Sequence, residues 1–129
     1  MKVQTKAKMI GEFGCLFFCY LYCSGQYTDD KDAIVKACEF MDNRLLDADC
    51  TVLDADTLLW TLTGKRYRVT KEKISDISEI REKTPVKYQC GQYGHWVVVE
   101  NGKIIFNSLD WSNCVQNGKP VEMRVINER

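Results

Sequence analysis

The single histidine of the chain, His95, stands at the start of an apolar stretch. A second apolar stretch follows it and ends at Asn107, where short polar side chains begin. Near the amino end, Gly14-Cys15 opens a third apolar stretch. An imidazole can act as general base for a thiol, and a side-chain amide can hold that imidazole in one tautomer. Cys15, His95 and Asn107 are therefore candidates for a nucleophilic site.

A β-hairpin between His95 and Asn107 would position two of these residues, and its turn decides which side chains face each other. A two-residue turn at Asn101-Gly102 places His95 opposite Ser108. A three-residue loop over 100–102 places His95 opposite Asn107 instead. Because side chains alternate between the two faces of a sheet, the two registers differ in every contact. We favour the second register, because it gives the imidazole an amide partner.

The segment from Cys15 to about Ser24 is apolar on all sides, which predicts a buried helix that ends at Gly25 in a left-handed conformation. A cysteine at the first position of a helix lies near unpaired backbone N–H groups and the positive end of the helix dipole. Both lower the thiol pKa and favour the thiolate. The competing interpretation is that Cys15 is a small buried hydrophobic residue.

The other expected elements place helices before strands along the chain. We expect a helix over about 31–45 that is capped by Asp29 or Asp30. Asp54 or Asp56 should cap a helix over 57–63, with Trp60 in the core. Further expected elements are a strand at 67–70, a short helix opened by Ser75 or Ser78, and strands at 86–90, at Cys114-Val115 and at 121–126. This order predicts an α+β fold in a single domain spanning residues 1–129.

Composition narrows the classes of function. Eighteen basic residues balance eighteen acidic ones, so nucleic-acid binding is not expected. Seven cysteines without a regular spacing, together with one histidine, predict neither a disulfide framework nor a metal site. No cofactor is expected. The apolar run from Cys15 to Cys23 is too short to span a membrane, and we expect a cytoplasmic protein with no membrane association.

The order of motifs resembles the papain-like cysteine peptidases: Gly-Cys opening a buried helix, Gly-His on a strand, and Asn at the end of the next strand. The closest resemblance is to the branch typified by the double-glycine leader peptidases of bacteriocin export, which includes small bacterial and phage domains. The resemblance implies N-terminal helices packed on a C-terminal antiparallel sheet. It also implies that Cys15 is the nucleophile, His95 the general base and acid, and Asn107 the residue that orients the imidazole. Asp110 is the alternative third member.

One departure from the family concerns the oxyanion hole. The family carries a glutamine a few residues before its cysteine, whereas the upstream candidate here is Gln4, eleven residues away. Three functions therefore stay open for the chain. It is a cysteine peptidase acting on a peptide or protein, a related amidase acting on cell-wall peptides, or a catalytically weak or inactive binding module such as a phage protein that contacts a host factor.

Overall fold

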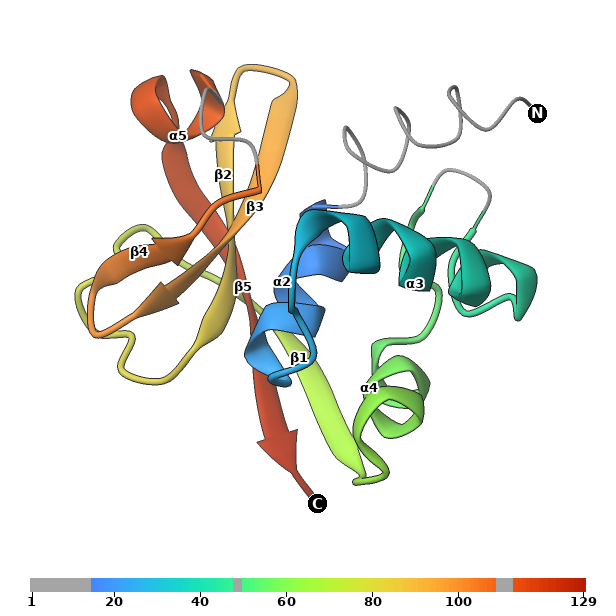
Figure 1. Ribbon diagram of the computed structural model, residues 1–129. Helices are drawn as coiled ribbons and strands as arrows, with labels where there is room; N and C mark the ends of the chain where they lie inside the picture. Colours follow the sequence, from blue (N-terminus) through green and yellow to red (C-terminus); the bar gives the residue numbers. More distant parts are fainter. Residues whose placement is uncertain (1–14, 48–49, 109–112) are drawn as a thin grey trace.

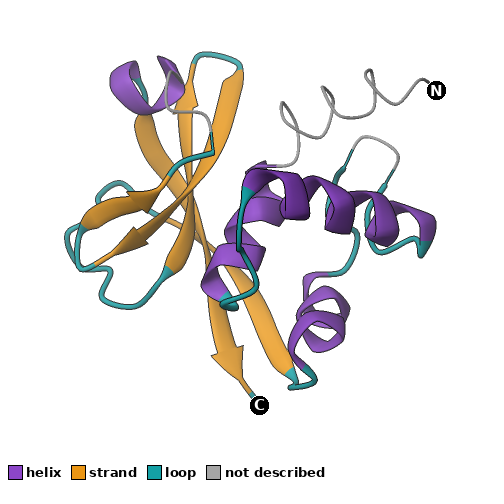
Figure 2. Cartoon of the chain, in the orientation of Figure 1, coloured by secondary structure: helices purple, strands orange, loops and turns teal. Residues whose placement is uncertain are grey.

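The computed structural model describes residues 15–47, 50–108 and 113–129. The chain order of the elements is clear in Figure 1, and Figure 2 separates helices from strands. The helices are α2 (Cys15–Cys23), α3 (Asp30–Asp42), α4 (Ala55–Thr63) and α5 (Asn113–Asn117). The strands are β1 (Tyr67–Lys73), β2 (Thr84–Cys90), β3 (Tyr93–Glu100), β4 (Lys103–Phe106) and β5 (Lys119–Glu128). No helix among the described residues is long and apolar enough to cross a lipid bilayer.

The five strands form one antiparallel sheet in the order β1-β5-β2-β3-β4. The last strand, β5, thus lies between β1 and β2, near the middle of the sheet (Figure 1). Helices come first along the chain and antiparallel strands follow, apart from the short α5. The α+β class expected from the sequence is therefore confirmed.

Local sequence signals define the ends of the helices. The Asp29 carboxylate accepts the backbone N–H of Asp32 at 2.7 Å and caps α3. The Asp54 carboxylate accepts the N–H of Thr57 at 3.2 Å and caps α4. Each cap pairs a backbone donor that the first helical turn leaves free. Gly25, directly after the turn that ends α2, has φ 75°, so the left-handed end predicted for this helix is confirmed.

Apolar side chains pack on both faces of the sheet. On one face, α2, α3 and α4 enclose the largest cluster, to which Val69, Phe106 and Ile126 of the sheet contribute. A smaller cluster joins α2 to β3 through Trp96 and Val98. The opposite face carries a separate cluster built on Val86, Tyr88, Val97 and Val99, together with Ile80. The sheet is therefore buried on two sides, with the helices of the N-terminal half on one of them.

Three local predictions were wrong. Residues 74–80 form no helix, because the Asp76 carboxylate accepts both the N–H and the hydroxyl of Ser78 and holds a turn there. The segment that begins at Asn113 is helical, as α5, rather than a strand. Trp60 is 50% exposed instead of lying in the core, and the Arg66 guanidinium stacks 5.2 Å from its ring centre.

The predicted register of the β3–β4 hairpin was also wrong in its turn. Glu100 pairs with Lys103, so the turn has two residues, and Asn101 and Gly102 both have positive φ, of 53° and 72°. Two positive φ values are typical of the primed turns that match the twist of a hairpin. A bulge then follows: Val99 pairs with Ile104, but Val98 pairs with Phe106.

Candidate active site

His95 and Asn107 form a hydrogen-bonded pair. Nε2 of His95 lies 2.7 Å from Oδ1 of Asn107, and the histidine is only 3% exposed. Because a carbonyl oxygen can only accept, Nε2 carries the proton in this arrangement. The lone pair of the neutral ring is then on Nδ1, which no hydrogen bond among the described residues occupies. The geometry expected for an orienting amide is therefore present.

The β-bulge brings the two side chains to the same face of the sheet. With a two-residue turn and a regular ladder, the histidine and Asn107 would have fallen on opposite faces. The extra residue, Ile105, shifts the pairing by one, and the register continued from Val98 and Phe106 places Asn107 opposite Val97. Val97 lies two residues after His95 on β3, so the two side chains point to the same face of the sheet. The two-residue turn and the bulge together place Asn107 on the face of His95, which we had expected a three-residue loop to do.

Cys15 is the first residue of α2 and lies against the edge of β3. Its side chain packs with Trp96 and Val98, and the residue is 8% exposed. Strand β4 pairs with β3 only from Val98 to Glu100, so no described strand pairs with β3 on that side at Trp96. The backbone N–H of Trp96 is directed at the Cys15 sulfur. The thiol thus lies beside the peptide unit that follows His95.

No hydrogen bond among the described residues joins the Cys15 thiol to the His95 ring. The structure brings His95 and Asn107 together. Cys15, however, packs on the sheet face of Trp96 and Val98, whereas His95 shares the opposite face with Val97, so the structure does not bring the thiol to the pair.

The helix terminus does not lower the Cys15 pKa overall, contrary to the expectation from sequence. Burial raises the pKa of this thiol above its usual 9.0. Three backbone N–H groups and the Lys87 ammonium act in the lowering direction, but desolvation outweighs them. In the absence of substrate, the balance favours the protonated thiol.

The pKa of His95 is shifted in the direction that favours the neutral imidazole, as the pKa of Cys15 is shifted toward the neutral thiol. Burial lowers its pKa below 6.5, and the hydrogen bond to Asn107 opposes this shift only in part. Desolvation penalises the charged form of either group, so both favour the uncharged state.

Lys87 is a member of this neighbourhood that the sequence analysis did not single out. It lies on β2 directly opposite Trp96, and it is the charged side chain that lowers the Cys15 pKa. Its stem crosses Gly94, where an added Cβ would lie 2.5 Å from the lysine Cε. Because Gly94 has no side chain, the stem of Lys87 can pass over it. The only signal in the sequence was the alternation of β2 together with Gly94.

The remaining candidates lie outside the described residues. Gln4, proposed for the oxyanion hole, and Asp110, the alternative third member, both fall in undescribed segments. Within the described ranges, no group of three or more His, Cys, Asp or Glu side chains is arranged to hold a metal ion.

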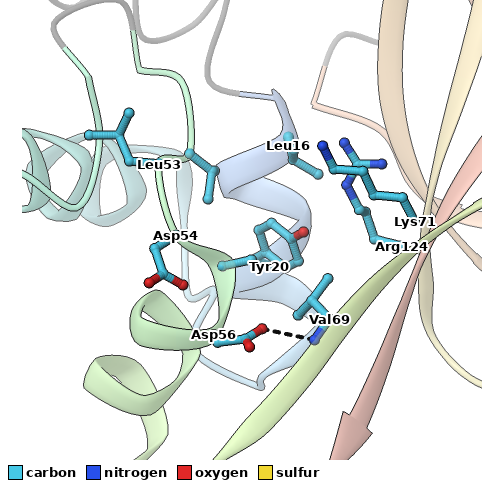
Figure 3. Close-up of a pocket in the computed structure, with 10 residues that line it drawn as sticks. Leu16, Tyr20, Leu53, Asp54, Asp56, Val69, Lys71 and Arg124 are labelled. Carbon is cyan, nitrogen blue, oxygen red and sulfur yellow. Dashed lines mark hydrogen bonds between the residues drawn. The ribbon is translucent and has the colours of Figure 1, made fainter.

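A cavity of about 340 Å³ opens next to the first turn of α2 (Figure 3). Leu16 and Tyr20 of α2 line it on one side, and β1 and β5 contribute Val69, Lys71 and Arg124. Residues 52–56, at the end of the loop after α3 and the start of α4, close it. Because Leu16 directly follows Cys15, this cavity is adjacent to the candidate nucleophile in the chain.

Comparison of the chain with models of protein families, with curated proteins and with solved structures gave no match.

Proposed function

We propose that the protein is a papain-like cysteine hydrolase that cleaves a peptide or amide bond with Cys15, His95 and Asn107. The observation that carries the proposal is the 2.7 Å contact between His95 Nε2 and Asn107 Oδ1. It leaves Nδ1 of a buried imidazole without a hydrogen bond among the described residues. The proposal requires Cys15, which packs on the Trp96 face of β3, to reach this nitrogen around the end of that strand. The same three residue types, in the same chain order, characterise the family that the sequence resembles.

The reaction begins from the uncharged pair. As the Cys15 sulfur attacks the substrate carbonyl carbon, the thiol proton moves to Nδ1 of His95. Asn107 accepts from Nε2–H throughout and stabilises the imidazolium. The C–N bond then breaks, and the amine leaves with the proton that His95 returns to it.

Water completes the cycle. It attacks the thioester formed on Cys15 while His95 removes one of its protons, and the carboxylic acid departs as the proton returns to the sulfur. A backbone N–H at the start of α2 is the donor available for the oxyanion. Without a glutamine close before the cysteine, we expect slow turnover, because one missing donor costs about a hundred- to a thousand-fold in kcat.

The test is to incubate the full chain with a peptide library made from a digested proteome and to identify new amino termini by mass spectrometry. We expect cleavages that disappear in Cys15→Ala and fall by about 100-fold or more in His95→Gln, because general acid–base catalysis is removed. Asn107→Ala should give a smaller loss, because the imidazole remains but is no longer held in one tautomer.

Cys38→Ser is the matched control, since Cys38 is a half-buried cysteine on α3. It should cleave like the wild type. Cleavage that survives Cys15→Ala, or an absence of cleavage by the wild type at high enzyme concentration, would contradict hydrolysis. Enrichment of uncleaved peptides on the immobilised protein would then favour a binding module.

A further inference from the structure

The cavity beside α2 has the size of a ligand pocket, and its two ends carry side chains of opposite charge. Its volume of about 340 Å³ lies at the lower end of the range of about 300 to 1,000 Å³ that is typical of small-ligand sites. Leu16 and Val69 give it apolar walls, and the ring of Tyr20 adds to them while its hydroxyl is hydrogen-bonded to Arg124. In Figure 3 the carboxylates of Asp54 and Asp56 lie toward one end, whereas the cationic groups of Lys71 and Arg124 lie toward the other, next to Leu16.

The cationic end contains an unusual pairing within the sheet. Lys71 of β1 and Arg124 of β5 are direct cross-strand partners. Like charges that face each other directly across two strands repel and destabilise the sheet. In Figure 3 their side chains run side by side toward the first turn of α2, instead of diverging into solvent. The positive end of the α2 dipole adds to the potential there.

The two carboxylates in the lining of the pocket do not pair with Lys71 or Arg124. Asp54 accepts the N–H of Thr57 as the cap of α4, and Asp56 accepts the N–H of Val69 at 2.8 Å. Both carboxylates are therefore held by the backbone at the far end of the pocket.

The two cations differ in their partners. Arg124 is ion-paired with Glu122, and its guanidinium lies 4.7 Å from the centre of the Trp96 ring. Lys71 has no hydrogen-bond or ion-pair partner among the described residues. One cation is thus fixed in place, while the other is free to take an anion.

The fixed cation also connects the pocket to the candidate nucleophile. Trp96, under the guanidinium of Arg124, packs against Cys15 and directs its N–H at the cysteine sulfur. A peptide group held between Lys71 and Arg124 would therefore lie close to a bond presented to Cys15.

We propose that this pocket is a subsite for a carboxylate of a bound peptide, with Lys71 and Arg124 as its recognition pair and Leu16, Tyr20 and Val69 as its apolar walls. The carboxylate comes from an aspartate or glutamate side chain or from a peptide C-terminus. The description of that peptide as a substrate rests on the proposed function, whereas its binding does not.

The test measures binding with the chemistry removed. The ¹⁵N-labelled full chain carrying Cys15→Ala is titrated with N-acetyl-glutamate N-methylamide and, separately, with its glutamine isostere. We expect saturable shifts at the backbone amides of Leu16, Val69 and Lys71 with the glutamate compound. The glutamine compound should bind about tenfold or more weakly, because it lacks the charge.

A second pair of compounds identifies the source of the carboxylate. N-acetyl-alanine carries a free backbone carboxylate, and its N-methylamide does not. Preferential binding of N-acetyl-alanine over the glutamate compound assigns the site to a peptide C-terminus. The reverse preference assigns it to an acidic side chain.

Substitutions connect the binding to the cation pair. Lys71→Met should weaken the glutamate compound roughly three- to tenfold and leave the glutamine compound unchanged. Arg68→Met is the matched control, because Arg68 lies on β1 with its side chain on the opposite face, and it should change neither affinity.

Equal affinity for the glutamate and glutamine compounds would overturn the proposal. So would an absence of saturable shifts for any carboxylate compound, or an unchanged affinity in Lys71→Met. The peptide-library experiment with wild-type protein fails or succeeds independently, so loss of hydrolysis with retained carboxylate binding would reject the enzyme and keep the subsite.

Discussion

At the scale of single residues, the protonation of Cys15 and His95 decides how the site works. Burial raises the pKa of the thiol and lowers the pKa of the imidazole. Both shifts oppose the thiolate–imidazolium pair, in which each group would carry a charge away from water. In the proposed reaction we therefore expect the proton to be transferred during the attack on the substrate rather than before it.

Lys87 is the residue whose substitution tests this balance most directly. Lys87→Met removes the ammonium that lowers the Cys15 pKa, so the pKa should rise further above 9.0. Alkylation of Cys15 by iodoacetamide, with the modified site located by mass spectrometry, should become roughly several-fold slower at pH 8, because less thiolate is present. Lys87→Arg should retain most of the rate, since it keeps the charge.

Two further variants separate charge from packing. Gly94→Ala should act in the same direction as Lys87→Met, because its Cβ would displace the lysine stem that passes 2.5 Å away. Lys103→Met, at the exposed end of the hairpin, should leave the rate unchanged. An unaltered pH profile for Cys15 in Lys87→Met would show that the ammonium does not influence the thiol.

At the scale of secondary structure, the β3–β4 hairpin couples two irregularities. The two-residue turn alone would turn Asn107 away from His95, and the bulge at Ile105 turns it back. The sequence could not show this, because Asn101-Gly102 fits either turn and nothing in Ile104-Ile105-Phe106 marks a bulge. The pairing of the histidine with the asparagine was predicted correctly, but for a reason that the structure replaces.

Because the turn and the bulge together set the faces of β4, a deletion and an insertion at Ile105 should have different effects. Removing Ile105 should leave Phe106 opposite Val98 and Asn107 on the face of His95, because only the bulged residue is lost. Inserting a second isoleucine after Ile105 should instead reverse the faces of Phe106 and Asn107.

The single histidine makes the measurement direct. NMR of the imidazole Nε2–H should show one hydrogen-bonded signal in the wild type and in the deletion variant, and its loss in the insertion variant. The opposite pattern would mean that the bulge does not set the faces of the hairpin.

At the scale of the whole molecule, features encoded by neighbouring residues were predictable and long-range ones were not. The caps Asp29 and Asp54 and the left-handed Gly25 follow from residues a few positions away. The position of β5 between β1 and β2 depends on contacts between distant segments, which no local pattern specifies. The turn at 74–80 was missed because isoleucine spacing suits a helix as well as a loop packed on a sheet.

Buried titratable groups should give the folded protein a stability that depends on pH in both directions. The folded His95 pKa is below 6.5, so the unfolded chain binds a proton first and the free energy of unfolding falls as the pH drops below 6.5. The pKa of Cys15, Cys19 and Cys23 is raised above 9.0, so stability also falls as the pH rises above 9.0.

Urea unfolding between pH 5 and pH 10 measures this profile. His95→Gln should flatten the acidic side between pH 5 and 6.5, because the group that titrates there is gone, and should leave the alkaline side unchanged. Cys19→Ala, at a fully buried cysteine, should reduce the loss above pH 9.0. Equal acidic slopes in wild type and His95→Gln would exclude the histidine as the cause.

The place of β5 in the sheet also has a consequence for the timing of synthesis. Strand β1 pairs with β5 alone among the described strands, so it stays unsatisfied while everything from Ile74 to Gly118 is being made. At translation rates of about 5 to 20 residues per second, the interval between the synthesis of β1 and that of β5 lasts roughly a few seconds. Lys71 and Arg124 can become neighbours only after that interval. A nascent chain therefore carries Cys15 and His95 before the cavity proposed to bind a carboxylate has been assembled.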